Sequence, residues 1–105
     1  MIVLPDADLD KAAAAAVQSR MMNAGQVCIA AKRFLVHQDV KAAFTEKVLL
    51  LIQNLKQGDP LDPATQLGPL ARLDLAEALE RQLQKALAQG ATLLYGGQRE
   101  GCNFQ

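Results

Sequence analysis

Cys28 is the residue in this sequence with the clearest capacity for chemistry. It ends the run Asn-Ala-Gly-Gln-Val-Cys at residues 23–28, after an apolar stretch with high helix propensity and before residues 34–37, which are typical of a short buried strand. A thiol is a good nucleophile when its thiolate is favoured and exposed, and backbone amides at a loop or helix start can provide both conditions. Cys28 is therefore a candidate nucleophile. The alternative is a small buried apolar residue, as many free cysteines are.

The helix before Cys28 is predicted from its start, composition and end. Asp8 is expected to N-cap a helix that runs through Lys11 to about Met22. The five alanines at 12–16 favour a helix and allow a neighbouring element to approach closely. Gly25 stands where a helix ends on a left-handed residue. Cys28 should thus lie in the loop just past this helix.

Two further helices are predicted from their apolar stripes. The first begins near Asp39 and the second spans residues 72–89, and a loop at 58–70 joins them. The inward stripe of the first is Val40, Phe44, Val48, Leu51 and Leu55. The second is expected to bury Leu75, Leu79, Leu83, Ala86 and Leu87, with Arg72, Glu77, Glu80, Arg81 and Lys85 in water. The loop is expected to be anchored by Leu61, Leu67 and Leu70.

Short strands complete the prediction. Residues 2–4 are typical of the end of a strand, and residues 33–37 and 92–95 are expected to be strands of one sheet, with the two amphipathic helices packed on it. Strands that alternate with helices favour an α/β fold with parallel pairing. The length of 105 residues predicts a single domain, residues 1–105.

Charge and apolar patterning exclude several classes of partner and place the chain in one compartment. Eleven acidic and eleven basic residues cancel without a run of either sign, so neither nucleic acid nor an anionic membrane is an expected partner. The apolar run at residues 1–4 is too short for a signal peptide or a membrane span. Two cysteines without a secretion signal favour reduced thiols and hence the cytoplasm.

Five segments distributed along the chain form a recognisable series. They are Val-Leu-Pro-Asp-Ala-Asp-Leu-Asp at 3–10, Gly-Gln-Val-Cys at 25–28, Arg-Phe-Leu-Val at 33–36, the Gly-Asp-Pro and Gly-Pro turns at 58–62 and 67–70, and the helix exit and glycine pair at 88–91 and 95–97. In this order they resemble the aldehyde dehydrogenase superfamily, and the resemblance covers nearly the whole chain. The sequences of 26–34 and 67–75 are most similar to bacterial succinate-semialdehyde dehydrogenases.

The resemblance implies a reaction and a role for Cys28. In the family, the cysteine thiolate adds to an aldehyde carbonyl, hydride then passes to NAD or NADP, and water hydrolyses the resulting thioester. The oxyanion is held by the amide of the cysteine and an asparagine side chain. Residues beside the cysteine contribute to the substrate pocket, so the resemblance makes Val27 and Ile29 candidate walls. It allows a homo-oligomer.

The resemblance also implies that this chain is only a fragment of a catalytic domain. The family's general-base glutamate and oxyanion asparagine lie upstream of residue 1, and its glutamate-phenylalanine motif lies beyond residue 105. No Gly-x-Gly-x-x-Gly segment occurs here, so NAD or NADP is expected in the full-length parent and not on this fragment. The isolated chain should therefore be inactive. The alternatives are a non-catalytic structural module from a truncated gene and a redox-sensing thiol that would need Cys102 as its partner.

Departures from the resemblance bear on substrate and metal. Met22 stands where some succinate-semialdehyde enzymes carry an arginine that could pair with the substrate carboxylate. Lys32 or Arg33 could in principle take that role, although a structural role is the favoured interpretation of Arg33. His37 has no ligand cluster at metal-binding spacing, so no metal site is predicted.

Overall fold

The structure, a computed structural model, describes residues 1–104, which group into two compact units, residues 1–56 and the residues from 57 onward. The first unit contains β1 (Ile2–Val3), α1 (Leu9–Met21), the 3-10 helix η1 (Met22–Gly25), β2 (Leu35–Val36) and α2 (Gln38–Gln53). The second contains α3 (Leu73–Ala88), β3 (Arg99–Glu100) and β4 (Asn103–Phe104). The expectation of one catalytic-domain segment over 1–105 stays a prediction.

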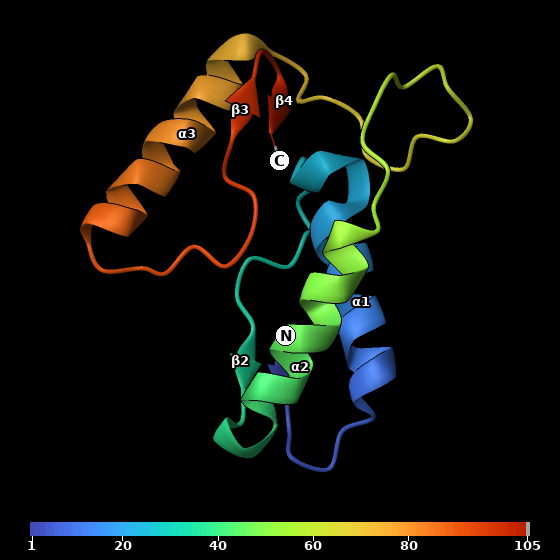
Figure 1. The fold of residues 1–105 in the computed structure, drawn as a ribbon, viewed down its shortest axis with the longest axis vertical. Helices are drawn as coiled ribbons and strands as arrows, with labels where there is room; N and C mark the ends of the chain where they lie inside the picture. The colour runs from blue at the N-terminus through green and yellow to red at the C-terminus, as the bar shows by residue number, and fades with distance from the viewer. Residues whose placement is uncertain (105) are drawn as a thin grey trace. The chain divides into compact units, whose positions relative to one another are not determined.

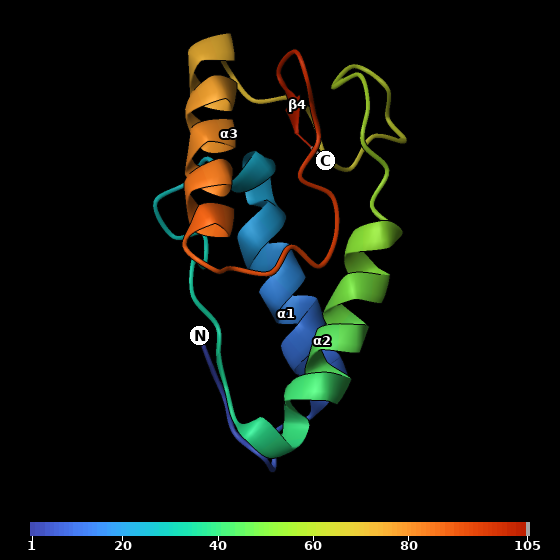
Figure 2. The same ribbon diagram turned by 60° about the vertical axis from the view of Figure 1, so that its left-hand side comes forward.

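A parallel pair of strands and two packed helices make up the first unit. β1 pairs with β2 so that Ile2 lies opposite Leu35 and Val3 opposite Val36. α1 and α2 lie side by side, as Figures 1 and 2 both show. Their core is the cluster of Val3, Ala13, Ala16 and Phe44. This arrangement confirms the predicted parallel α/β fold and the close packing expected of the alanine run.

The N-cap of α1 is the predicted one. The Asp8 carboxylate accepts a hydrogen bond of 3.2 Å from the amide of Lys11. That bond, together with the Lys11 ammonium, lowers the pKa of the Asp8 carboxyl below its usual value. Because the folded-state pKa is depressed, the contribution of Asp8 to stability is present above its unfolded pKa and is lost as the pH falls through the folded one.

The stripe of α2 is confirmed in its first half and wrong near its end. Val40 and Val48 pack against the core around the buried Phe44, as expected. Leu51 is exposed, and Ile52 instead lines the small apolar cavity between α1 and α2. A helix turns 100° per residue, so one position of drift is enough to replace Leu51 by Ile52 on the inner face.

Replacing Phe44 by alanine is expected to destabilise the first unit by about 3–5 kcal/mol, because a 5% exposed aromatic ring is removed from its core. Native-state hydrogen exchange of the α1 and α2 amides measures this loss within the unit itself. The matched control is Leu50→Ala on the same helix, where the side chain is 53% exposed and the expected change is below about 1 kcal/mol. Equal losses in the two variants would contradict this core assignment.

The second unit contains α3, a hairpin and an ordered loop. α3 begins and ends within one residue of its predicted bounds. β3 and β4 pair antiparallel, and the turn between them includes Gly101 at φ +59°, in the left-handed region that glycine favours. An Arg99–Glu80 ion pair of 2.8 Å joins this hairpin to α3. The loop is anchored by Leu67 and Leu70, as expected.

Three expectations for the second unit are wrong. Residues 92–95 form no strand, because no strand among residues 1–104 runs beside them to complete their hydrogen bonds, and the antiparallel β3–β4 pair forms further along. Leu61 is 88% exposed and does not anchor the loop. Leu75 and Leu79 are exposed, because the inner face of α3 is centred on Ala76, whose small side chain permits close contact.

Within residues 1–104, no helix is both long and apolar enough to cross a lipid bilayer.

Candidate active site

The chain reverses direction directly after α1, in a left-handed turn. Gly25 has φ +75°, the left-handed conformation predicted for it, but α1 has already ended at Met21, and Asn23 and Ala24 also lie in the left-handed region at φ +50° and +54°. The amide of Gln26 donates to the carbonyl of Asn23 at 3.1 Å, and its side-chain amide donates to the same oxygen at 2.9 Å. In the Gly-Gln pair, Gly25 thus adopts the left-handed conformation and Gln26 stabilises the turn through its two hydrogen bonds.

Cys28 lies in a second tight turn that follows at once. The amide of Ala30 donates to the carbonyl of Val27 at 3.1 Å, which places Cys28 and Ile29 at the two central positions. Cys28 is exposed, Ile29 is 75% exposed and Ala30 is buried. The exposure meets one requirement of a nucleophile, and the alternative of a buried apolar cysteine is wrong. Cys28 and Cys102 are both free thiols.

Two side chains from the last turn of α1, Ser19 and Arg20, form hydrogen bonds with the backbone on either side of the cysteine turn. Arg20 donates from Nη2 to the carbonyl of Gly25 at 2.8 Å and from Nη1 to the carbonyl of Ala31 at 3.1 Å. The Ser19 hydroxyl accepts from the amide of Ala31 at 3.2 Å. Sequence reasoning missed both residues. Their only sequence signal is that they are polar residues on the last turn of the helix, after the apolar run at 12–17.

A shallow hollow of about 210 Å³ lies beside the cysteine turn. It combines apolar surface from Met22 and Ile29 with the polar side chains of Gln18 and Ser19. Ile29, one of the two residues predicted to contact substrate, therefore shares a concave surface with Met22. Val27, the other, lies half-buried in the turn and does not line this hollow. The hollow is large enough for a short aliphatic chain.

Lys32, Arg33 and His37, the other polar residues considered for substrate or metal binding, do not line the hollow by Ile29. Lys32 and Arg33 are exposed, and the carbonyl of Arg33 accepts from the N-terminal amine at 3.0 Å. His37 caps α2, with Nδ1 accepting from the amide of Asp39 at 3.4 Å. No three of the His, Cys, Asp and Glu side chains in residues 1–104 are grouped to hold a metal ion.

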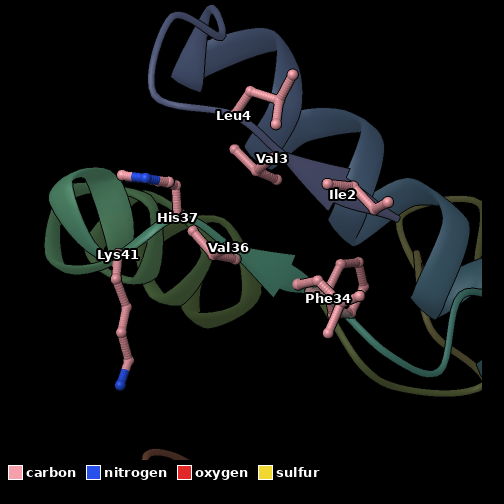
Figure 3. A pocket seen from close by; sticks show the side chains of 8 residues that line it. Ile2, Val3, Leu4, Phe34, Val36, His37 and Lys41 are labelled. Carbon is pink, nitrogen blue, oxygen red and sulfur yellow. The ribbon is translucent and has the colours of Figure 1, made fainter.

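A larger apolar groove of about 530 Å³ runs along the β1–β2 pair in the first unit. Figure 3 shows that its side chains come from both strands and from the start of α2. Cys28 lines neither this groove nor the hollow by Ile29, and the hollow is the candidate because Ile29 belongs to the turn that carries Cys28. Its lining residues are Ile2, Val3, Leu4, Phe34, Leu35, Val36, His37 and Lys41.

Comparison with known proteins gives matches along the whole chain. A family model described as the aldehyde dehydrogenase family matches residues 1–105. The NAD(P)+ succinate semialdehyde dehydrogenase of Escherichia coli (strain K12) is 52% identical over 98 residues, which are 93% of this chain and 21% of that protein. The NADP(+) succinate-semialdehyde dehydrogenase of Mycolicibacterium paratuberculosis (strain ATCC BAA-968 / K-10) is 51% identical over 96 residues, 91% of this chain and 20% of that protein. The chain therefore spans about a fifth of the length of these relatives.

Solved structures give the same result. A 3,6-anhydro-L-galactose dehydrogenase matches with a TM-score of 0.96 and 38% identity, over 100% of this chain and 24% of that one. A succinate-semialdehyde dehydrogenase from Burkholderia pseudomallei matches with a TM-score of 0.92 and 38% identity, over 99% of this chain and 22% of that one.

Proposed function

This chain belongs to the aldehyde dehydrogenase family and has the α/β fold of part of its catalytic domain, and from that premise we propose that it carries the nucleophile, Cys28, of a longer NAD(P)-dependent enzyme of the succinate-semialdehyde type. One observation carries the proposal: the thiol is exposed at the centre of a braced turn, in a chain whose full length matches the family. The similarity to succinate-semialdehyde dehydrogenases supports the substrate class.

The chemistry that this chain supplies is the first bond. The Cys28 thiolate attacks the aldehyde carbon, a C–S bond forms, and the carbonyl π electrons move to oxygen to give a thiohemiacetal alkoxide. The amide of Cys28 is one donor that could hold the developing charge. Ile29 and Met22 would contact the alkyl part of the substrate. Val27, the other predicted pocket residue, is half-buried in the turn that carries Cys28, and its contact with substrate stays a prediction.

NAD or NADP supplies the hydride acceptor in the parent enzyme. The residues present do not fit such a group, since the chain contains no Gly-rich phosphate-binding loop and the hollow beside Cys28 exposes no arginine or lysine. We therefore assign no cofactor contact to this chain. The cytoplasmic location and a homo-oligomer of the parent stay predictions.

The test is a chimera of the Escherichia coli relative in which this chain replaces the matching fifth of that enzyme. The identity of 52% makes such a replacement feasible without a change of fold. NADH or NADPH formation from succinate semialdehyde is the expected result. A folded chimera without activity would favour the non-catalytic module instead.

Replacing Met22 by arginine is expected to shift the chimera toward succinate semialdehyde. Met22 is 44% exposed and lies beside Ile29 on the hollow, so a guanidinium there could pair with the substrate carboxylate. A charge-assisted hydrogen bond of about 1.5–3 kcal/mol corresponds to a gain of at least about tenfold in kcat/KM. Steady-state kinetics with succinate semialdehyde and butanal measure the shift.

The control is Met22→Leu, which keeps the volume and adds no charge, and which should change both aldehydes alike. An equal response of the two aldehydes to arginine would remove position 22 from substrate selection. If the unsubstituted chimera already preferred butanal, methionine at this position would be the better guide to substrate than the overall similarity.

A further inference from the structure

We propose that Arg20 is a positioning residue for Cys28, acting as a clamp that closes the two ends of the cysteine turn onto the last turn of α1. This inference deepens the proposed function and rests on it, because a position matters only if the thiol reacts. Arg20 touches neither Cys28 nor a substrate. It acts through the backbone on either side of the turn.

The clamp consists of three hydrogen bonds that bracket residues 26–30. Arg20 reaches the carbonyl of Gly25 before the turn and the carbonyl of Ala31 after it, at 2.8 and 3.1 Å. Ser19 accepts from the amide of Ala31, so both backbone polar groups of that residue are bound by α1. With both ends fixed, the turn that presents Cys28 has few conformations left to sample.

The guanidinium sits tightly against the backbone. A Cβ atom at position 25 would lie 2.0 Å from Nη2 of Arg20, so any residue other than glycine would have to displace the guanidinium. Gly25 also has φ +75°, so its lack of a side chain meets two separate needs. The stem of Arg20 lines the apolar cavity of about 60 Å³ between α1 and α2, together with Met21 and Phe34.

Arginine is specifically suited to this place. Its planar fork can donate to two carbonyl oxygens at once, whereas the single ammonium of lysine on a flexible stem cannot span both with the same geometry. Arg20 also lies in the last turn of α1, where positive charge is favoured by the helix dipole. Loss of the head group would leave two partly enclosed carbonyls without their donors.

Hydrogen exchange of the 105-residue chain tests the clamp. Arg20→Met keeps the stem and removes both donors, and we expect amide exchange in residues 23–31 to rise by about tenfold or more while α2 changes by less than about twofold. Arg20→Lys should give an intermediate rate. Gly25→Ala should reproduce the effect because its Cβ displaces the guanidinium. The control is Arg81→Met, an exposed arginine of α3, which should change neither region.

A uniform rise across α1, α2 and the loop would show a general destabilisation and overturn the positioning role, as would unchanged exchange in residues 23–31. If Arg20→Met fails to fold as an isolated chain, Arg20→Lys and Arg20→Met are compared in the chimera. There a positioning role predicts a fall in kcat of about tenfold with KM changed by less than about threefold, and partial recovery with lysine. Equal effects on kcat and KM, or full recovery with lysine, would count against the clamp.

The two proposals fail separately. A chimera that stays active after Cys28→Ala would refute the role of the thiol while leaving the exchange result intact. A chimera that needs Cys28 but tolerates Arg20→Met would keep the nucleophile and refute the clamp.

Discussion

The chimera is expected to lose NAD(P)H formation when Cys28 is replaced by alanine, with kcat/KM falling by at least about ten-thousand-fold. The methyl group of alanine cannot form the C–S bond, so no thiohemiacetal arises. Without that tetrahedral intermediate, the hydrogen on the aldehyde carbon is not transferred as hydride. Removing the nucleophile of a covalent mechanism has effects of this order or larger. The measurement is NADH or NADPH absorbance over a range of succinate semialdehyde concentrations from below to above KM, together with a mass-spectrometric search for the acyl adduct.

Cys102 provides the matched control for this substitution. It is the other free thiol of the chain, it lies in the second unit, and Cys102→Ala should retain activity within about twofold. Circular dichroism of both variants verifies the fold. A Cys28→Ala chimera with normal turnover would remove Cys28 from the proposed role, and an equal loss in both variants would show that either thiol merely supports the structure.

The 105-residue chain alone is expected to give no detectable turnover of any aldehyde. General-base and oxyanion groups each contribute two or more powers of ten, roughly 3 kcal/mol apiece, and hydride transfer needs a bound acceptor. The chain matches about a fifth of its relatives and contains no Gly-rich dinucleotide motif. A thiol that still reached an aldehyde would stop at the thiohemiacetal.

The assay compares the chain with the chimera, using succinate semialdehyde and butanal with both NAD and NADP. Detection of a covalent adduct cannot replace this assay, since adduct formation alone is compatible with both outcomes. Steady NAD(P)H production by the purified chain, which Cys28→Ala abolishes, would show that the chain is catalytically sufficient and would defeat the expectation of a fragment.

Features fixed by local interactions were predictable from the sequence. The N-cap at Asp8 and the left-handed Gly25 each depend on a few neighbouring residues, and both are where the sequence places them. The apolar stripe around Phe44 follows from the helical period alone, so its centre was predictable. Only near its end was the prediction wrong, where Ile52 faces inward in place of Leu51. Cys28 was found because its surroundings resemble a family, and its exposure followed from the loop in which it lies.

Features that depend on distant partners were not predictable. The apolar run at 92–95 has a strand-like composition, but a strand forms only where another backbone completes its hydrogen bonds. The exposed Leu75 and the buried Ala76 differ by one position on a helix, which sequence periodicity locates poorly. Arg20 escaped notice because its partners are backbone carbonyls, and these carry no sequence signal.

The parallel pairing of β1 with β2 has a consequence for the order of folding. Parallel neighbours cannot be joined by a hairpin, so α1 and the whole cysteine turn lie inside the crossover between Val3 and Leu35. Helix formation takes less than about a microsecond, whereas pairing across such a crossover must first overcome the entropy of ring closure. We therefore expect α1 to form early and the geometry around Cys28 to be set late, in the same kinetic step that brings the two strands together.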